Sequence, residues 1–151
     1  MKIIYIVVIL SAVVSCNSTE KDSAFESPQQ SELDKTSLVH CYRYANENDT
    51  VILKLIHVGK SITGGLVYKL KEKDKNEGTI QGFMRDSLLI ADYTFISEGI
   101  QSIRQSVFKL EDNGFMEGYG DIIEHNGRVQ FKSIDSLSFN TSMILTEIPC
   151  R

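Results

Sequence analysis

The sequence lacks several features that mark common functional classes. It has no tryptophan and only three histidines, so it offers neither an indole ring for stacking a sugar nor a histidine at triad spacing from a serine. No G-x-S-x-G segment occurs, and no glycine-rich loop precedes a helical pattern. We therefore predict no catalytic residues, no cofactor and no enzymatic activity.

Basic residues are also in the minority. Lysine and arginine total 16 against 20 acidic residues, which gives a formal net charge of −4. A mildly acidic chain without a basic stripe is a poor candidate for binding nucleic acid. Attraction to anionic lipids is an equally poor explanation for any membrane attachment, because it requires clusters of basic residues.

The longest apolar run lies at the N-terminus and is short. Residues 1–14 read MKIIYIVVILSAVV, with Lys2 as the only charge, and charges return at Glu20, Lys21 and Asp22. A helix that crosses ~30 Å of hydrocarbon needs about 20 apolar residues, so a retained transmembrane anchor is the weaker interpretation. A single charge followed by an apolar core and a small residue is typical of a secretory signal peptide.

The end of this run, from Val13 to Cys16, resembles the lipobox of bacterial lipoproteins, in which an aliphatic, a variable and a small residue precede an invariant cysteine. The resemblance implies that residues 1–15 are removed and that the Cys16 thiol carries a diacylglycerol, with the new amino terminus acylated. Two or three acyl chains suffice for stable anchoring. The resemblance thus implies an outer-membrane lipoprotein of a bacterial cell envelope; an ordinary signal peptide with an incidental cysteine is the alternative.

Residues 16–37 are expected to form the lipidated cysteine and a disordered tether. The segment is polar and charged, so it cannot bury enough apolar surface to fold. About 20 flexible residues span roughly 25 Å, which would hold residues 38–151, a single β-domain, clear of the membrane. Glu20 and Asp22 loosely resemble the surface-export signal of Bacteroidota lipoproteins, so the periplasmic and outer faces both remain open.

Three cysteines leave an odd thiol in an exported chain unless one is otherwise committed. If Cys16 carries lipid, Cys41 and Cys150 remain for a disulfide in an oxidising compartment. Two buried free thiols are the alternative. Closing a loop of about a hundred residues would restrict the unfolded chain by ~4–5 kcal/mol.

From residue 38 onward, apolar and polar residues alternate and turn residues recur about every 8 to 12 positions, which is typical of antiparallel strands. Gly59 with Lys60, and Asn126 with Gly127, are expected to form two-residue hairpin turns. The strand around Arg104 is ambiguous because apolar residues occupy both of its faces. The first turn predicts four residue pairs: His57 with Ile62, Leu55 with Gly64, Leu53 with Leu66, and Val51 with Tyr68. A four-residue loop before this hairpin predicts three more: His40 with His57, Tyr42 with Leu55, and Tyr44 with Leu53.

A long meander exposes two edge strands unless it closes on itself. Nine strands are evident, and residues 134–139 are expected to form a tenth short strand, or a loop or helical turn across one end. A disulfide between Cys41 and Cys150 would fasten the first strand beside the last, which requires an even strand count. We predict an all-β, antiparallel up-and-down meander that closes into a small lipocalin-like barrel of eight to ten strands, with Gly64 and Gly65 at a bend.

Three segments, EKDKNEGTIQGFM, ADYTFISEG and EGYGD, are similar to small Bacteroidota lipoproteins that carry a lipocalin-like or fatty-acid-binding-like barrel on a lipid tether. The likeness covers most of residues 38–150. It implies the barrel and the envelope location but no activity.

Five aromatic residues on the inward face are the candidate lining of a ligand cavity: Tyr42, Tyr44, Tyr68, Tyr93 and Phe95. A barrel of this size commonly holds one small apolar molecule at its mouth. Because the domain has few bulky residues to spare, we expect these rings to fill most of the interior instead.

Two polar groups are weaker candidates. His40 and His57 face each other across two strands, but two imidazoles alone do not make a metal site, and we predict none. Glu117, Tyr119 and Asp121 are expected on one side of a single strand. Paired carboxylates could act as acid and base, although a solvated strand face is the ordinary explanation.

These features predict a lipid-anchored, non-enzymatic binding or structural module of unknown specificity. One alternative is a carrier of a small hydrophobic ligand. Another is a protein inhibitor of an envelope hydrolase that acts through an exposed loop such as residues 71–78. An empty apolar cavity would favour the carrier, whereas a solid interior with an ordered, protruding loop would favour inhibition or the binding of an envelope protein.

Overall fold

The computed structural model describes residues 38–112 and 114–150. The expected signal peptide at residues 1–15, the lipidated Cys16 and the tether to residue 37 lie outside the described residues. Within the described part of the chain, no helix is long and apolar enough to cross a membrane.

The described chain forms a succession of β-strands joined mostly by short turns. The strands are β1 (Val39–Ala45), β2 (Thr50–Val58), β3 (Ser61–Lys69), β4 (Asn76–Arg85), β5 (Leu88–Ser97), β6 (Ile100–Glu111), β7 (Gly114–Tyr119), β8 (Ile122–His125), β9 (Arg128–Phe131) and β10 (Ser138–Ile148). Asn126 and Gly127 adopt φ of 54° and 72° between β8 and β9. Positive φ at both positions is what the expected type I′ hairpin turn requires.

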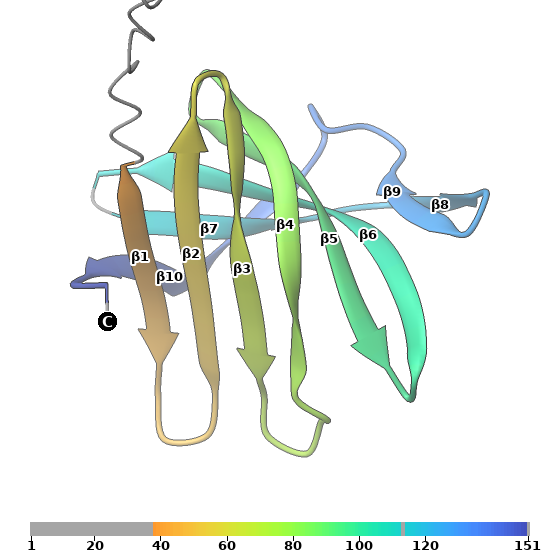
Figure 1. The fold of residues 1–151 in the computed structure, drawn as a ribbon, viewed down its shortest axis with the longest axis horizontal. Helices are drawn as coiled ribbons and strands as arrows, with labels where there is room; N and C mark the ends of the chain where they lie inside the picture. Colours follow the sequence, from red (N-terminus) through yellow and green to blue (C-terminus); the bar gives the residue numbers. More distant parts are fainter. Residues whose placement is uncertain (1–37, 113, 151) are drawn as a thin grey trace, which may run out of the picture. The chain divides into compact units, whose positions relative to one another are not determined.

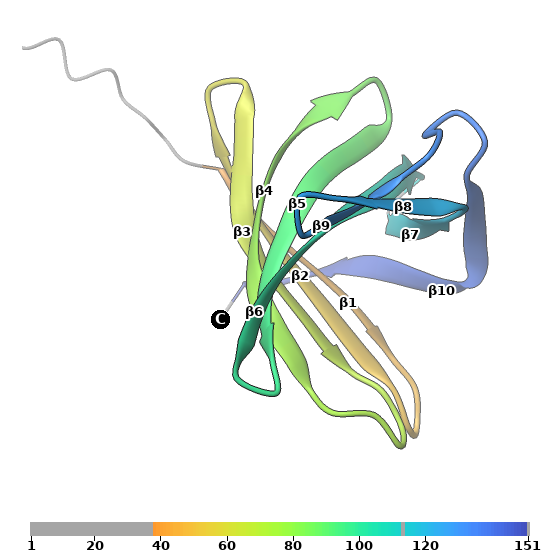
Figure 2. The ribbon, with the colours of Figure 1, turned by 90° about the vertical axis from the view of Figure 1, so that its right-hand side faces the viewer.

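Eight of these strands close into a barrel. Neighbours pair in the order β5-β4-β3-β2-β1-β10-β7-β6, and β5 also pairs with β6, which completes the circle. The remaining two strands form the hairpin β8–β9, which lies outside the circle with β9 running parallel to β6 at Ile103 and Arg104 (Figure 1, Figure 2). The predicted all-β, antiparallel barrel is therefore confirmed, with one hairpin as an excursion from the meander.

The strand register agrees with the sequence in one hairpin and differs in the other. All four predicted pairs between β2 and β3 are present. The pairs between β1 and β2 are displaced by two residues, so that Tyr44 lies opposite Val51 and not Leu53. The loop has the expected four residues, but it begins at Asn46, one residue earlier than the predicted pairs require. The side chain of Asn46 accepts hydrogen bonds from the backbone N–H of Asn48 (2.8 Å) and Asp49 (2.6 Å) within this loop. A shift of two residues keeps every side chain on its predicted face.

The even strand count arises differently from the prediction. The single strand expected to carry Glu117, Tyr119 and Asp121 is divided into β7 and β8 at Gly120, where an added Cβ would lie 2.7 Å from a methyl of Leu137. Residues 134–139 begin as a turn, in which the backbone N–H of Leu137 donates to the carbonyl of Ile134 (3.3 Å), and end in the first residues of β10. The expectation of a loop across this segment holds for its first part.

The predicted disulfide joins the first and last strands of the barrel. Cys41 on β1 lies opposite Ile148 of β10. Its sulfur is bonded to that of Cys150, with the two Cα atoms 5.3 Å apart and a sequence separation of 109. This separation is typical of a disulfide, and the covalent bond lies across the seam at which the barrel closes.

β6 carries apolar residues on both faces because both faces are covered. Phe108 belongs to the interior core, and Arg104 lies on the same inward face, against the ring of Tyr93. Val107 points to the outer face and is nevertheless fully buried. An added Cβ at Gly118 would lie 3.1 Å from a methyl of Leu137, so residues 134–139 pack closely on this outer wall and form a second, smaller apolar layer.

Candidate functional site

The centre of the barrel is filled with side chains. Three of the five rings predicted to line a cavity pack on one another: Tyr93 stacks on Phe95 with centroids 4.7 Å apart, and Tyr68 meets Tyr93 edge-on at 5.9 Å, while Tyr44 is partly buried against the core. Tyr42 packs edge-on against Phe115. A space large enough for water would expose the side chains around it, yet several of the largest interior side chains have an exposure of 0%: Tyr93, Phe108, Leu53, Leu66, Leu89 and Leu145.

A buried carboxylate sits toward one end of this core. Glu117 on β7 is only 8% exposed. The hydroxyl of Tyr68 donates to its Oε1 at 2.6 Å, and the hydroxyl of Tyr119 donates to its Oε2 at 3.1 Å. Nη2 of Arg104 lies 3.8 Å from Oε1. Each residue of this polar cluster (Tyr68, Arg104, Glu117 and Tyr119) is placed by alternation on the inward face of its strand.

Arg104 also interacts with aromatic rings. Its guanidinium carbon lies 5.1 Å from the ring centre of Tyr68, 5.3 Å from that of Tyr93 and 5.7 Å from that of Phe95. These distances lie within the range of cation–π attraction, which stabilises a charge in a partly desolvated setting. The side chain remains 38% exposed, so Arg104 connects the buried carboxylate to solvent.

Burial dominates the electrostatics of the polar cluster. Desolvation raises the pKa of the Glu117 carboxyl, and the Tyr68 hydroxyl and Arg104 oppose that rise. Burial raises the pKa of Tyr93 and of Tyr119 to about 12, and the pKa of Tyr68 lies well above its ordinary value, because burial and Glu117 both disfavour a tyrosinate. The three hydroxyls therefore remain protonated, and those of Tyr68 and Tyr119 donate to the Glu117 carboxyl.

The candidate carboxylates do not form a pair. Glu117 and Tyr119 are brought together, but Asp121 lies beyond the end of β7, where its side chain is 3.7 Å from Nζ of Lys132. The expectation that all three share one strand face is wrong for Asp121, because the chain turns at Gly120 before reaching it. An acid–base pair of the kind found in glycosidases needs two carboxyls around one substrate, and this arrangement does not supply it.

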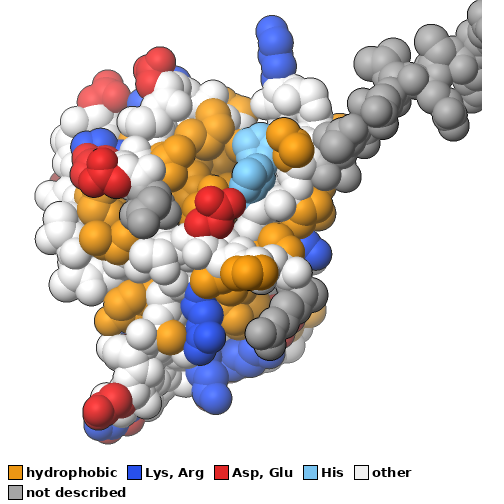
Figure 3. Space-filling model, turned by 90° about the vertical axis from the view of Figure 1, so that its left-hand side faces the viewer, with side chains coloured by type: hydrophobic (Ala, Val, Ile, Leu, Met, Phe, Trp, Pro, Cys, Tyr) orange, Lys and Arg blue, Asp and Glu red, His pale blue; other side chains and the backbone are white. Residues whose placement is uncertain are grey.

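The two candidate histidines lie on the rim at the other end of the barrel. His40 and His57 meet edge-on with ring centroids 5.7 Å apart, and Nδ1 of His40 lies 2.8 Å from Oε1 of Glu147. Figure 3 shows histidine, acidic and hydrophobic side chains next to one another on this face. Among the described residues, no cluster of three or more histidine, cysteine, aspartate or glutamate side chains could hold a metal ion.

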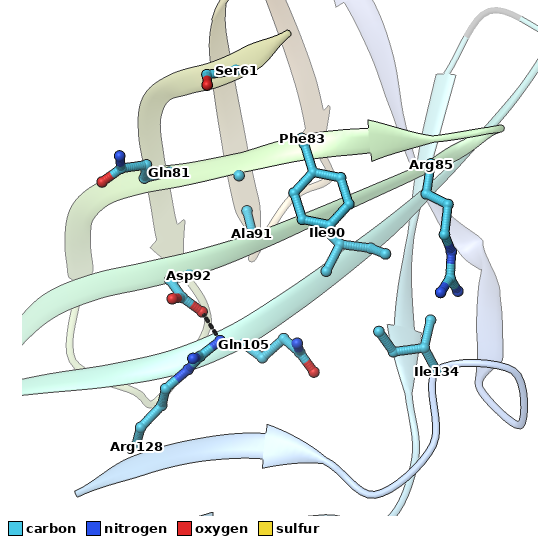
Figure 4. Close-up of a pocket in the computed structure, with 11 residues that line it drawn as sticks. Ser61, Gln81, Phe83, Arg85, Ile90, Ala91, Asp92, Gln105, Arg128 and Ile134 are labelled. Atoms are coloured by element: carbon cyan, nitrogen blue, oxygen red, sulfur yellow. Dashed lines mark hydrogen bonds and ion pairs between the residues drawn. The ribbon is translucent and has the colours of Figure 1, made fainter. Parts of the chain in front are cut away.

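A groove of about 450 Å³ lies on the outer wall, between β4, β5 and β6 on one side and the β9 segment on the other (Figure 4). Its apolar part includes Phe83, which is 50% exposed, and the nearly buried Ile90. Its polar part includes the ion pair between Arg128 of β9 and Asp92 of β5. Gln105 lies at the same place and accepts a hydrogen bond from the backbone N–H of Phe131 at 3.2 Å, which fixes the hairpin against the wall.

Sequence reasoning missed both the polar cluster and the outer groove. The polar cluster had one signal in the sequence: Arg104 alternates with Ser106 and Phe108 on the inward face of its strand, which is an unusual place for a charged side chain. The signal for the groove was weaker, because it depends on the hairpin β8–β9 folding back onto β6. Comparison of the chain with protein-family models, with curated proteins and with solved structures finds no match.

Proposed function

We propose that this protein is a lipid-anchored, non-enzymatic binding module of a bacterial outer membrane, which holds its partner on the outside of the barrel. The anchoring rests on the lipobox-like segment that ends at Cys16 and on the polar stretch that follows it. The fold supplies a compact body, sealed by the disulfide between Cys41 and Cys150, at the end of that tether.

The observation that carries the proposal is the contrast between the inside and the outside of the barrel. Tyr93 and Phe108 in the centre are completely buried, so a cargo molecule would have to displace aromatic side chains that pack on one another. The outer groove offers about 450 Å³ of open space instead. It combines the exposed ring of Phe83 with the charged groups of Asp92 and Arg128, and apolar surface with a few convergent polar groups is the usual composition of a binding site.

Site-specific photo-crosslinking in the native envelope tests the proposal. A photoreactive residue at Phe83, which is 50% exposed in the groove, is expected to give one discrete adduct with an envelope protein. The same residue at Ile96, 65% exposed on the outer face at the end of β5, is the matched control and is expected to give none. Equal crosslinking at both positions, or none at Phe83, would contradict binding in the groove.

A second candidate function, inhibition of an envelope hydrolase, is favoured by the loop between β3 and β4. The backbone N–H of Lys71 donates to Oδ1 of Asp49 (2.8 Å), and that of Lys73 donates to the carbonyl of Leu70 (3.2 Å). The loop thus has a defined shape, and it projects beside the β1–β2 loop (Figure 1). Preorganised loops bind tightly because little conformational freedom is lost on binding.

An inhibition assay distinguishes this second candidate from the first. The intact protein would slow a hydrolase of its own envelope, and the double variant Lys73→Ala with Lys75→Ala would lose that effect. Lys60→Ala, at the exposed turn between β2 and β3, is the matched control and should inhibit as well as the parent chain. Inhibition that survives the double variant would exclude the loop as the contact surface.

A further inference from the structure

The hairpin that leaves the barrel ends in an open strand edge. Among the described strands β8 pairs only with β9, and it stands last in the sheet order. Every residue of β8 is exposed, including Ile122 at 58% and Ile123 at 40%. Of the devices that protect such an edge, lysine, proline and a bulge are absent from β8, and its protection is limited to its short length and the charge of Glu124.

The hydrogen-bonding pattern of the hairpin determines which backbone groups are free. A two-residue turn makes its flanking residues a hydrogen-bonded pair, here His125 and Arg128. Since hydrogen-bonded and non-hydrogen-bonded pairs alternate along antiparallel strands, Ile123 also points its N–H and C=O toward β9. The carbonyl of Asp121, which accepts from the N–H of Lys132 at 2.8 Å, continues the alternation. The backbone groups of Ile122 and Glu124 therefore point away from the hairpin.

We propose that β8 pairs with β8 of a second copy of this chain, antiparallel, with Ile123 of each copy facing Ile123 of the other across a two-fold axis. In this register, Ile122 of one copy faces Glu124 of the other. The outward N–H and C=O groups of Ile122 in one copy then bond to those of Glu124 in the other. No outward backbone group of either strand is left without a partner. Strand addition of this kind obtains its binding energy from main-chain hydrogen bonds.

Backbone and side chains favour this register over shifts by one residue and over the register centred on Glu124. Shifts by one residue are excluded because they would place free backbone groups opposite groups already bonded to β9. A shift that centres the axis on Glu124 would set two carboxylates directly opposite each other, which is destabilising. The register centred on Ile123 places two isoleucines in contact and sets Asp121 of one copy opposite His125 of the other, a carboxylate against an imidazole that can donate to it. The interface is isologous, as expected for a dimer with two-fold symmetry.

A contact of four residues a side is small, and the dimer is expected to be weak in dilute solution, since stable interfaces bury more than about 1,000 Å². Confinement of two copies to one surface raises their effective concentration. That enhancement rests on the lipid anchor of the proposed function, whereas the strand pairing itself does not.

Cysteine crosslinking of the full-length chain tests the pairing. Residues directly opposite in a non-hydrogen-bonded pair have Cβ atoms about 4.5–5.5 Å apart, so the Ile123→Cys variant is expected to form a disulfide-linked dimer on mild oxidation. The Ile122→Cys variant is the matched control on the same strand. Its cysteine would face Glu124 of the partner and should crosslink poorly. The unsubstituted chain measures any background from Cys16.

A second variant distinguishes strand pairing from chance collision. Proline at position 124 removes an outward N–H and leaves the ladder to β9 intact, because Glu124 is not hydrogen-bonded to Val129 in this alternation. Adding Glu124→Pro to Ile123→Cys is expected to reduce the dimer by about tenfold or more, since the free edge is lost. Circular dichroism verifies that the barrel still folds.

Each other outcome overturns the proposal. Equal dimer yields from Ile122→Cys and Ile123→Cys would mean random encounter. A dimer that survives Glu124→Pro would place the contact elsewhere. Adducts of Ile123→Cys with a different protein and none with itself would assign the edge to an extended segment of another partner. None of these results depends on whether Phe83 crosslinks in the outer groove, so the two proposals fail separately.

Discussion

Replacing Tyr68 by phenylalanine removes one hydroxyl from the interior of the barrel. That hydroxyl donates to Glu117 at 2.6 Å, and Tyr68 is only 6% exposed. A hydrogen bond to a charged group contributes about 1.5–3 kcal/mol to stability, and water cannot replace this donor in the packed core. Glu117 keeps the Tyr119 hydroxyl and the nearby Arg104, so the carboxylate is not left isolated. We expect the free energy of unfolding to fall by about 2 kcal/mol at neutral pH.

The size of this loss depends on pH, with a definite sign. Burial raises the pKa of Glu117 in the folded chain, and the Tyr68 hydroxyl lowers it. A carboxyl with a raised folded pKa stabilises the fold fully below its unfolded pKa and loses that contribution as the pH rises through its folded pKa. Tyr68→Phe raises the folded pKa of Glu117 further. The deficit caused by Tyr68→Phe is therefore smallest in acid, where Glu117 is protonated in both states, and grows as the pH rises from the ordinary value of 4.5 toward neutrality.

Urea unfolding followed by circular dichroism measures this effect at several pH values. Tyr44→Phe is the matched control, because the Tyr44 hydroxyl accepts a hydrogen bond from Asn46 at 2.9 Å in an exposed setting. The control should change the free energy of unfolding by less than about 0.5 kcal/mol. A Tyr68→Phe loss no larger than that of the control, or one that shrinks as the pH rises, would refute the role assigned to the polar cluster.

Three further predictions concern the frame of the barrel. Replacing both Cys41 and Cys150 by alanine removes the bond across the seam and should lower the free energy of unfolding by ~4–5 kcal/mol; an unchanged urea midpoint would contradict this. Gly64→Ala should destabilise the fold by about 3 kcal/mol or more, because its Cβ would lie 1.8 Å from the carbonyl oxygen of Lys54. Gly65→Ala is the control: the nearest atom to its Cβ would be 3.8 Å away, so its thermal melt should match that of the parent chain. Glu117→Gln keeps an acceptor for Tyr68 and removes the ionisable group. In the parent chain, the free energy of unfolding should fall between pH 4.5 and 7 because the pKa of Glu117 is raised, and in the variant this fall should be absent.

The fold was largely predictable because it depends on local patterns. Alternating apolar residues on both sides of Gly59 and Lys60 fixed the pairing of β2 with β3. Of the three cysteines, Cys16 was assigned to the lipobox-like segment, which left Cys41 and Cys150 as the predicted disulfide pair. The pairing of β1 with β2 was displaced by two residues because alternation of period two cannot distinguish registers that differ by an even number.

The polar cluster was not predictable, since its members come together only when the barrel closes. Tyr68 and Glu117 are 49 residues apart in sequence and lie on strands that are not neighbours. The outer wall of β6 was ambiguous for a related reason. Val107 is fully buried on the outer face, beside Gly118, against which Leu137 packs. Leu137 reaches this wall only after the hairpin β8–β9, so no local sequence pattern could predict the contact.

Native mass spectrometry of the full protein, purified from its own membrane in mild detergent, tests two claims at once. These are that Cys16 carries a lipid anchor and that the barrel interior is filled by its own side chains. The expected mass is that of the chain from Cys16 onward with its acyl groups, two hydrogens fewer for the Cys41–Cys150 bond, and no retained small molecule. An unmodified thiol at Cys16 would contradict the lipid anchor, and a hydrophobic molecule that stays bound to the barrel would contradict a partner held on its outside.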